Sequence, residues 1–164
     1  RVDVVERAPQ LSTEGAGVQL GPNVTRILRA WGLQDALNAV AVFPQHLCAR
    51  DARDGRVVGQ VALSAGAQRY GAPHVCIHRA DLQTLLWQAA ERELGVRWHW
   101  GQGLQSVGQT AEHVWVRSDA GQSWHADGLV LADGIGSTLR RHVLGGGAAT
   151  PTGHIALRAL LPMA

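Results

Sequence analysis

The segment from Asp127 to Arg140, with the sequence DGLVLADGIGSTLR, constrains the fold of this chain more than any other. Its apolar part, Leu129 to Ala132, predicts a short strand buried on both faces, as in a parallel sheet. The strand stops at Asp133-Gly134, and after a glycine-rich turn Ser137 is placed to cap a short helix that carries Arg140. Ligands of open α/β sheets bind beyond the carboxyl ends of such strands. A ribose or pyrophosphate site and an ordinary strand-turn-helix connection both account for the pattern.

Composition favours a packed globular protein. The chain has 164 residues, 46% apolar and 17% charged, which suits one domain or a domain and a half. The net charge is only +2 and the arginines are scattered, which argues against a nucleic-acid partner. We expect no membrane span and no signal peptide. Cys48 and Cys76 are too few for a disulfide framework, so the expected location is the cytoplasm.

The segment Arg1 to Arg7 predicts a strand that closes on a carboxylate, Glu6. The second strand of a dinucleotide-binding unit ends on such a carboxylate, which takes the ribose hydroxyls, and a glycine-rich fingerprint lies about 20 residues upstream. No fingerprint precedes Glu6. Either Glu6 is only a polar strand end, or the chain lacks its first strand and helix.

Further elements follow from local patterns. The glycines of residues 15–23 permit close approach to a ligand or only form turns. A helix is predicted from Pro22 to about Trp31, with Ile27, Leu28 and Trp31 on one face. The other expectations are a hairpin over residues 45–61 turning at Asp54-Gly55, a loop at 64–73, a strand at 74–78, a long helix from Arg79 to Gly95, and a strand at 155–161. Short strands at 96–100, 104–109, 113–117 and 122–126 would form an antiparallel unit. These elements indicate an α/β arrangement with an inserted antiparallel layer.

His74, Cys76 and His78 alternate on the predicted strand and are zinc-competent side chains. Their spacing matches no common zinc motif, so we expect no metal. Trp98, Trp100, Trp115 and Trp124 lie in the predicted antiparallel strands, where cross-strand aromatic pairs explain them without a stacking ligand.

Five motifs in this order and spacing resemble class A FAD-dependent monooxygenases, in the branch of the salicylate, 3-hydroxybenzoate and 6-hydroxynicotinate hydroxylases. They are Glu6-Arg7, residues 15–23 (GAGVQLGPN), residues 78–82 (HRADL), residues 127–140 and residues 152–158 (TGHIALR). The resemblance implies an FAD-binding Rossmann-like fold of the glutathione-reductase type, with a parallel sheet and an antiparallel β insertion, truncated at both ends. It implies a partial FAD-binding domain over 1–150, with the antiparallel strands at about 96–126, and the start of a substrate-binding sheet over 151–164.

The resemblance also implies roles for residues at the nucleotide end of the cofactor. Glu6 would hold the adenosine ribose of FAD, and Arg7 would lie over the adenine side. Leu104 would meet the adenine through its main chain. Asp133-Gly134 would contact the pyrophosphate of FAD and of NAD(P)H, and Arg140 would support that turn.

Nearer the flavin, Arg79 would contact the nucleotide around its phosphate and ribityl part. The loop from Gly15 to Gln19, which includes Gly17, would border the flavin ring and the aromatic substrate. Gln19 falls where one branch carries a substrate-contacting histidine, so it is a candidate substrate contact. The hydroxynicotinate branch has another histidine at the position of Leu157, and leucine cannot handle a proton, so no catalytic residue is assigned.

The implied activity is hydroxylation of a hydroxybenzoate- or salicylate-like aromatic substrate through a flavin hydroperoxide, with NADH or NADPH and O₂ as co-substrates. The chain would be a fragment, inactive alone, of a protein that is a candidate homodimer at full length. Two alternatives stay open: a non-catalytic nucleotide-binding remnant, and an FAD-dependent oxidoreductase of a non-hydroxylating branch.

Overall fold

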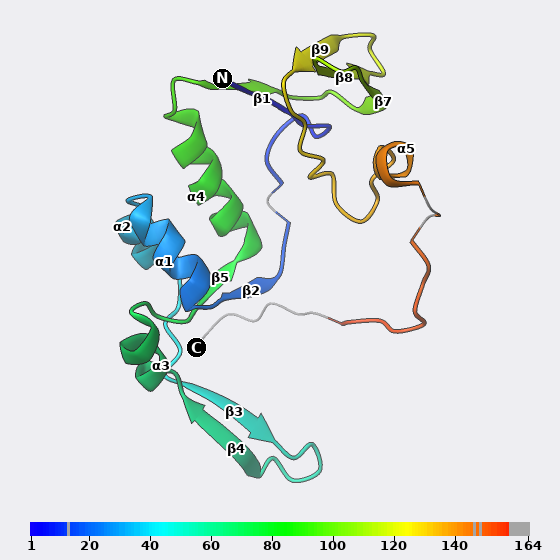
Figure 1. The fold of residues 1–164 in the computed structure, drawn as a ribbon. Coiled ribbons are helices and arrows are strands. Elements are labelled where there is room, and N and C mark those ends of the chain that lie inside the picture. The colour runs from blue at the N-terminus through cyan, green and yellow to red at the C-terminus, as the bar shows by residue number, and fades with distance from the viewer. Residues whose placement is uncertain (13, 146, 148, 158–164) are drawn as a thin grey trace. The chain divides into compact units, whose positions relative to one another are not determined.

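The computed structural model describes residues 1–12, 14–145, 147 and 149–157. The chain divides into two compact units: unit 1 comprises Arg1–Gln10 and Leu94–Leu157, and unit 2 is built on Leu11–Glu93. Both units combine helices with strands, which confirms the expected α/β class (Figure 1). Among the described residues, no helix has the length and apolar character needed to cross a membrane.

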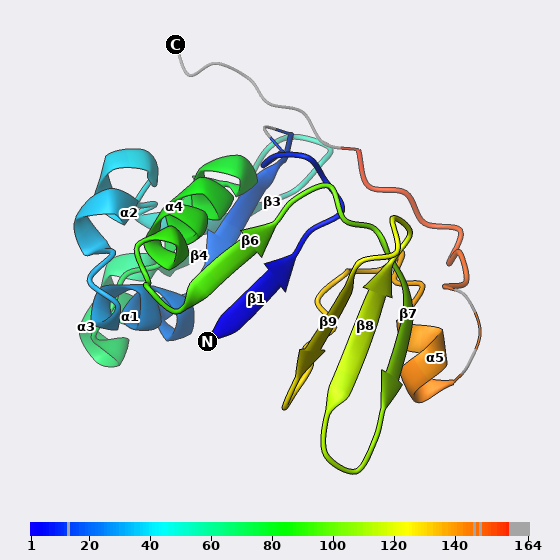
Figure 2. The ribbon, with the colours of Figure 1, turned by 90° about the horizontal axis from the view of Figure 1, so that it is seen from above.

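A parallel strand pair forms one part of unit 1. Strand β1 (Val2–Val5) pairs in parallel with β6 (Val96–His99), with Val2 opposite Val96 (Figure 2). The ladder continues past β1, because the Glu6 backbone N–H donates to the His99 carbonyl at 2.9 Å. The expectation that residues 96–100 join the antiparallel unit is therefore wrong. The valine-rich N-terminal segment, about ninety residues away in sequence, provides the pairing partner instead.

Asp3 organises one face of this parallel pair. Its carboxylate accepts two hydrogen bonds from the Arg97 guanidinium, at 3.0 and 3.2 Å, and lies 2.8 Å from His99 Nε2. Arg97 stands directly opposite Asp3 in the ladder, and His99 is two residues further along the same face. Trp98 and Trp100 stack on each other, with ring centroids 5.3 Å apart.

An antiparallel three-stranded sheet completes the strands of unit 1. It contains β7 (Leu104–Gln109), β8 (Val114–Ser118) and β9 (Ser123–Ala126), in that order. This confirms the predicted antiparallel layer over these three strands, and Gly121, in the turn before β9, has φ +82°. The short helix α5 (Arg140–Leu144) packs near β7 (Figure 2). An edge-to-face contact between His99 and Trp124 links β6 to β9.

The predicted strand at Leu129 to Ala132 does not form. Val130 is 87% exposed, and in the described part of the chain no strand pairs with this segment. An extended segment without a hydrogen-bonded neighbour is not a strand, however apolar it is. The predicted strand at 155–161 is likewise absent over residues 155–157, and its remainder lies outside the described residues.

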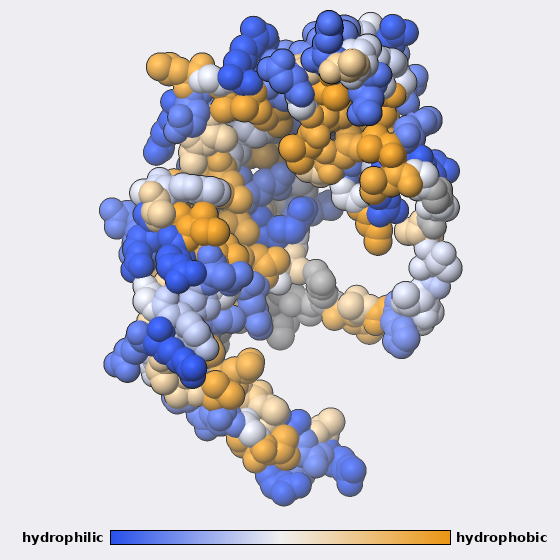
Figure 3. Space-filling view, viewed as in Figure 1, coloured by the Kyte–Doolittle hydropathy of each residue, from blue (hydrophilic) through white to orange (hydrophobic). Residues whose placement is uncertain are grey.

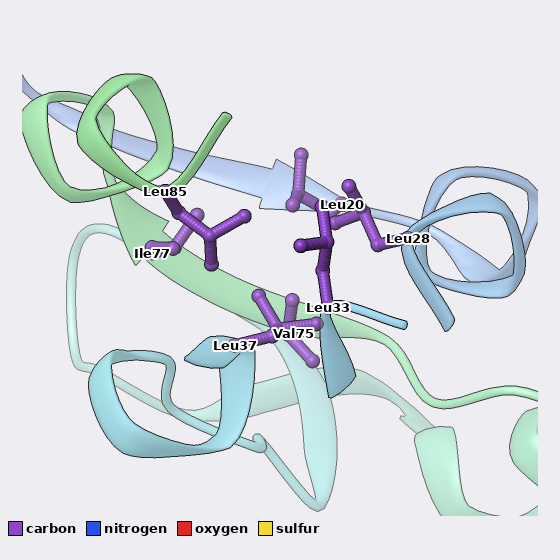
Figure 4. Packing of buried hydrophobic residues seen from close by; sticks show 7 residues of the cluster. All are labelled: Leu20, Leu28, Leu33, Leu37, Val75, Ile77 and Leu85. Atoms are coloured by element: carbon purple, nitrogen blue, oxygen red, sulfur yellow. The ribbon is translucent and has the colours of Figure 1, made fainter. Parts of the chain in front are cut away.

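Unit 2 is built around an antiparallel pair, β2 (Gly17–Leu20) and β5 (Val75–His78), covered on one face by helices. The helices are α1 (Pro22–Ala30), α2 (Gln34–Val40) and α4 (Arg79–Glu91). Alternation along the two strands sends Leu20, Val75 and Ile77 into the core. There they meet leucines from the helices and their connections: Leu28, Leu33, Leu37 and Leu85 (Figure 4).

Helix α1 begins at Pro22 and is followed by Gly32 at φ +74°, as predicted. Its buried face differs from the expected one. Leu28 is buried, but Ile27 is 48% and Trp31 65% exposed, whereas Thr25 is 1% exposed. Thr25 can be buried in place of the two apolar side chains because its hydroxyl donates a hydrogen bond to the Pro73 carbonyl at 2.7 Å. A polar group that is hydrogen-bonded in this way is tolerated in the interior.

Residues 64–73 were predicted as a loop, yet helix α3 (Leu63–Tyr70) occupies most of them. The helix buries no side chain, so no contact with the core marks it as an element of the fold. It ends at Gly71, which has φ +70°, a left-handed conformation suited to glycine.

The predicted hairpin is confirmed as β3 (His46–Arg50) and β4 (Val57–Ala62), with Gly55 at φ +74° in the turn. Every residue of both strands is exposed. The apolar side chains among them include Leu47, Val58 and Val61, each more than half exposed. Figure 3 shows hydrophobic residues on the surface of this hairpin.

Candidate functional site

Strand β1 leads Glu6 into a loop that is bonded to the loop after β6. The Gln102 N–H donates to the Glu6 carbonyl at 2.9 Å, and the Gly101 N–H donates to the Ala8 carbonyl at 3.0 Å. The Glu6 carboxylate is half-buried, and its Oε1 accepts the Ala8 N–H at 2.7 Å. These bonds set the position of the carboxylate through the backbone of both loops.

Arg7 and Leu104 lie beside Glu6, in or next to these two bonded loops. A Cβ added to Gly103 would lie 3.8 Å from Arg7 Cγ and 2.8 Å from Asp119 Oδ2, so a side chain there would require the Asp119 carboxylate to shift. Leu104 follows directly and begins β7. The structure therefore brings Glu6, Arg7 and Leu104 together, and we call residues 6–8 and 101–104 the Glu6 cradle.

Gln102 in this cradle was not singled out from the sequence. Its Oε1 is buried and has no hydrogen-bond partner among the described residues. Leaving a buried acceptor without a donor costs about 1–3 kcal/mol. The flanking glycines are the one signal that could have drawn attention to it, because Gly101 has φ +68° and marks a tight loop.

The turn after Asp133 has the predicted form. Gly134 has φ +75°, and its carbonyl accepts the Ser137 N–H at 3.2 Å. The Ser137 hydroxyl accepts the Arg140 N–H at 3.0 Å, as a capping serine would, but the N-cap residue of α5 is Leu139, which makes no side-chain cap bond. Asp133 is exposed and Arg140 is half-buried. Both belong to an open depression of about 560 Å³, lined by Leu129, Leu131, Ala132, Asp133, Gly134, Ser137, Arg140, Val143 and Leu144.

In unit 2, the face of the β2–β5 pair opposite the core is polar. Gly17 stands opposite His78, and Gln19 stands opposite Cys76. Directly paired residues share a face, and alternate residues return to it, so Gln19, Cys76 and His78 lie together. The expected loop from Gly15 to Gln19 is therefore wrong from Gly17 onward, because this segment gains a full ladder with β5.

Arg79 begins α4 directly after this face. Its N–H donates to the Ala16 carbonyl at 3.0 Å, and its Nη2 donates to the Glu14 carbonyl at 3.2 Å. His78 Nε2 lies 3.1 Å from the Gly15 carbonyl oxygen. A Cβ on Gly15 would lie 2.9 Å from the Arg79 Cβ, so glycine permits the segment before β2 to pass close to α4.

The predicted site residues thus form three groups. Two groups lie in unit 1: one contains Glu6, Arg7 and Leu104, and the other contains Asp133, Gly134 and Arg140. The third group lies in unit 2 and contains Gly17, Gln19 and Arg79. The described residues include no group of three or more His, Cys, Asp or Glu side chains placed to hold a metal ion.

Known proteins resemble this chain over nearly its whole length, although no family model matches it. It is 34% identical over 165 residues to 3-hydroxybenzoate 6-hydroxylase of Klebsiella oxytoca, an alignment covering 100% of this chain and 41% of that protein. It is 33% identical over 162 residues to 6-hydroxynicotinate 3-monooxygenase of Bordetella bronchiseptica, covering 98% and 42%. The chain therefore spans about two fifths of the length of these relatives.

Among solved structures, the fold resembles HpxO of Klebsiella pneumoniae, which was crystallised with FAD and uric acid. The TM-score is 0.72 and the sequence identity 25%, over 86% of this chain and 35% of that one.

Proposed function

We propose that this chain, which belongs to the class A FAD-dependent monooxygenases, forms part of the FAD-binding region of an aromatic hydroxylase. The substrate would be hydroxybenzoate- or salicylate-like, with NADH or NADPH and O₂ as co-substrates. The observation that carries the proposal is the 34% identity to 3-hydroxybenzoate 6-hydroxylase, which extends over 100% of this chain. The Glu6 cradle supports it independently, as geometry suited to one end of the cofactor.

The residues of the cradle fit the adenosine half of FAD. Ribose hydroxyls and the adenine amino group are hydrogen-bond donors, and the cradle presents acceptors to match them. The Glu6 carboxylate uses one oxygen for the Ala8 N–H, and Gln102 Oε1 is buried with no donor from the described residues. Gly103 keeps the loop free of a side chain where a Cβ would crowd Asp119.

When bound, FAD would supply the redox chemistry, in which NAD(P)H provides electrons and one oxygen atom of O₂ enters the aromatic ring. The side chains of this chain would bind and orient. Glu6 would hold the ribose, and the Asp133-Gly134 turn would approach the pyrophosphate. Gln19, on the polar face of β2 and β5, would contact the substrate, with Arg79 beside it on the nucleotide.

The test uses the polypeptide as it is naturally encoded. We expect a yellow protein with flavin absorbance whose NADH or NADPH oxidation is stimulated by 3-hydroxybenzoate, salicylate or 6-hydroxynicotinate, with O₂ uptake and a hydroxylated product. A colourless protein that takes up no FAD would overturn the proposal. Flavin binding without aromatic product would favour a nucleotide-binding module or a non-hydroxylating oxidoreductase.

A further inference from the structure

Gln102 has a buried acceptor that the described part of the chain leaves unsatisfied. The location of the residue is set by backbone bonds rather than by a mobile side chain. Its own N–H donates to the Glu6 carbonyl at 2.9 Å, and the preceding Gly101 N–H donates to Ala8 at 3.0 Å. Gln102 is thus bonded directly to Glu6 and lies two residues before Leu104.

An amide oxygen that is buried without a donor has lost its hydrogen bonds to water and has gained none from the protein. Proteins retain such an atom where a ligand or an ordered water supplies the missing donor. The other residues of the cradle are proposed to hold the ribose, through Glu6, and the adenine, through the Leu104 backbone. The adenine ring carries one strong donor group, its exocyclic amine, and its exposed ring nitrogens are acceptors.

We infer that Gln102 recognises the base of the bound dinucleotide, with Oε1 accepting a hydrogen bond from the adenine amino group. This inference rests on the proposed function, because it presupposes that the Glu6 cradle binds the adenosine half of FAD. It adds a specificity: the cradle selects a purine with a donor at this position over one without it.

The experiment compares two competitors of FAD on the flavin-free, naturally encoded protein: ADP, and purine riboside 5′-diphosphate, which has a hydrogen in place of the amino group. We expect ADP to bind about tenfold more tightly, the worth of one hydrogen bond to a buried acceptor. Gln102→Leu should abolish that preference. The matched control is Gln109→Leu, at the exposed last position of β7, which should keep it.

The melting temperature separates recognition from a structural role. Because none of the residues that the structure describes donates to Oε1, Gln102→Leu should leave the flavin-free protein as stable as before or more so, while FAD raises the melting temperature less. If Gln102→Leu does not fold, the binding of the two competitors is compared in Gln102→Asn, whose side chain is one methylene shorter and withdraws the amide oxygen. Equal binding of the two competitors, or a preference that survives the substitution, would overturn the inference and leave the proposed function intact. A protein that binds no FAD would overturn both.

Discussion

Gly108 lies against the indole of Trp115, its partner across β7 and β8, so closely that a Cβ at position 108 would be 2.5 Å from two ring carbons. An alanine there forces the indole to move, and overpacking of this kind costs about 1–3 kcal/mol. We predict that Gly108→Ala lowers the free energy of unfolding of unit 1 by that amount and shifts tryptophan emission to longer wavelength. Gly128→Ala is the control, because nothing lies within 4 Å of its added Cβ. Indistinguishable denaturation curves for the two variants would contradict the packing argument.

Thr25 and Pro73 make the hydrogen bond that ties α1 to the segment before β5, at 2.7 Å. Thr25→Val keeps the shape and the β-branched backbone preference but leaves the Pro73 carbonyl without this donor. We predict a loss of about 1–2 kcal/mol in the free energy of unfolding, measured by urea denaturation. Thr84→Val on the exposed face of α4 should change it by less than about 0.5 kcal/mol. Equal effects would show that the buried bond contributes nothing net.

The Asp3 carboxylate has two partners on the strand beside it, with Arg97 Nη2 at 2.9 Å and His99 Nε2 at 2.8 Å from its Oδ1. Because the Arg97 side chain is 48% exposed, solvent screens the pair, and we predict that Asp3→Asn costs only about 1 kcal/mol. The loss should shrink in 1 M NaCl, where the Debye length is about 3 Å. Asp127→Asn, at an exposed position, is the control. A loss that does not depend on salt would indicate that hydrogen bonding rather than charge is responsible.

Elements with strong local signals could be predicted from the sequence. The helix beginning at Arg79 has leucines at helical spacing, and Leu85 is buried as that spacing requires. Asp54-Gly55 likewise indicated the β3–β4 hairpin. In each case the chemistry that determines the structure lies within a few residues.

What could not be predicted depends on partners distant in sequence. Nothing local in Val96–His99 indicates a parallel pairing with Val2–Val5 rather than the antiparallel sheet that follows. Leu129 to Ala132 has the composition of a buried strand but no neighbour to pair with in the described part of the chain. Gln102 was missed because a buried oxygen that the described residues leave without a donor is visible only in the folded cradle.

Glu6 is the residue of the cradle whose substitution most directly tests cofactor binding. Its carboxylate is half-buried and held by the Ala8 N–H at 2.7 Å. Gln at this position keeps an acceptor for Ala8 but removes the charge. Hydrogen bonds to charged groups are worth about 1.5–3 kcal/mol, so we predict that Glu6→Gln weakens FAD binding by about 10- to 100-fold.

Flavin fluorescence titration of the naturally encoded protein measures this loss, with FMN as the matched ligand because it lacks the adenosine half. Affinity for FMN should not change, since no proposed contact of Glu6 involves the flavin end. Glu112→Gln, at an exposed position between β7 and β8, controls for the loss of one negative charge. Weakened binding of both flavins would contradict the prediction, because it would show that the substitution disturbs the protein beyond the adenosine end of the site.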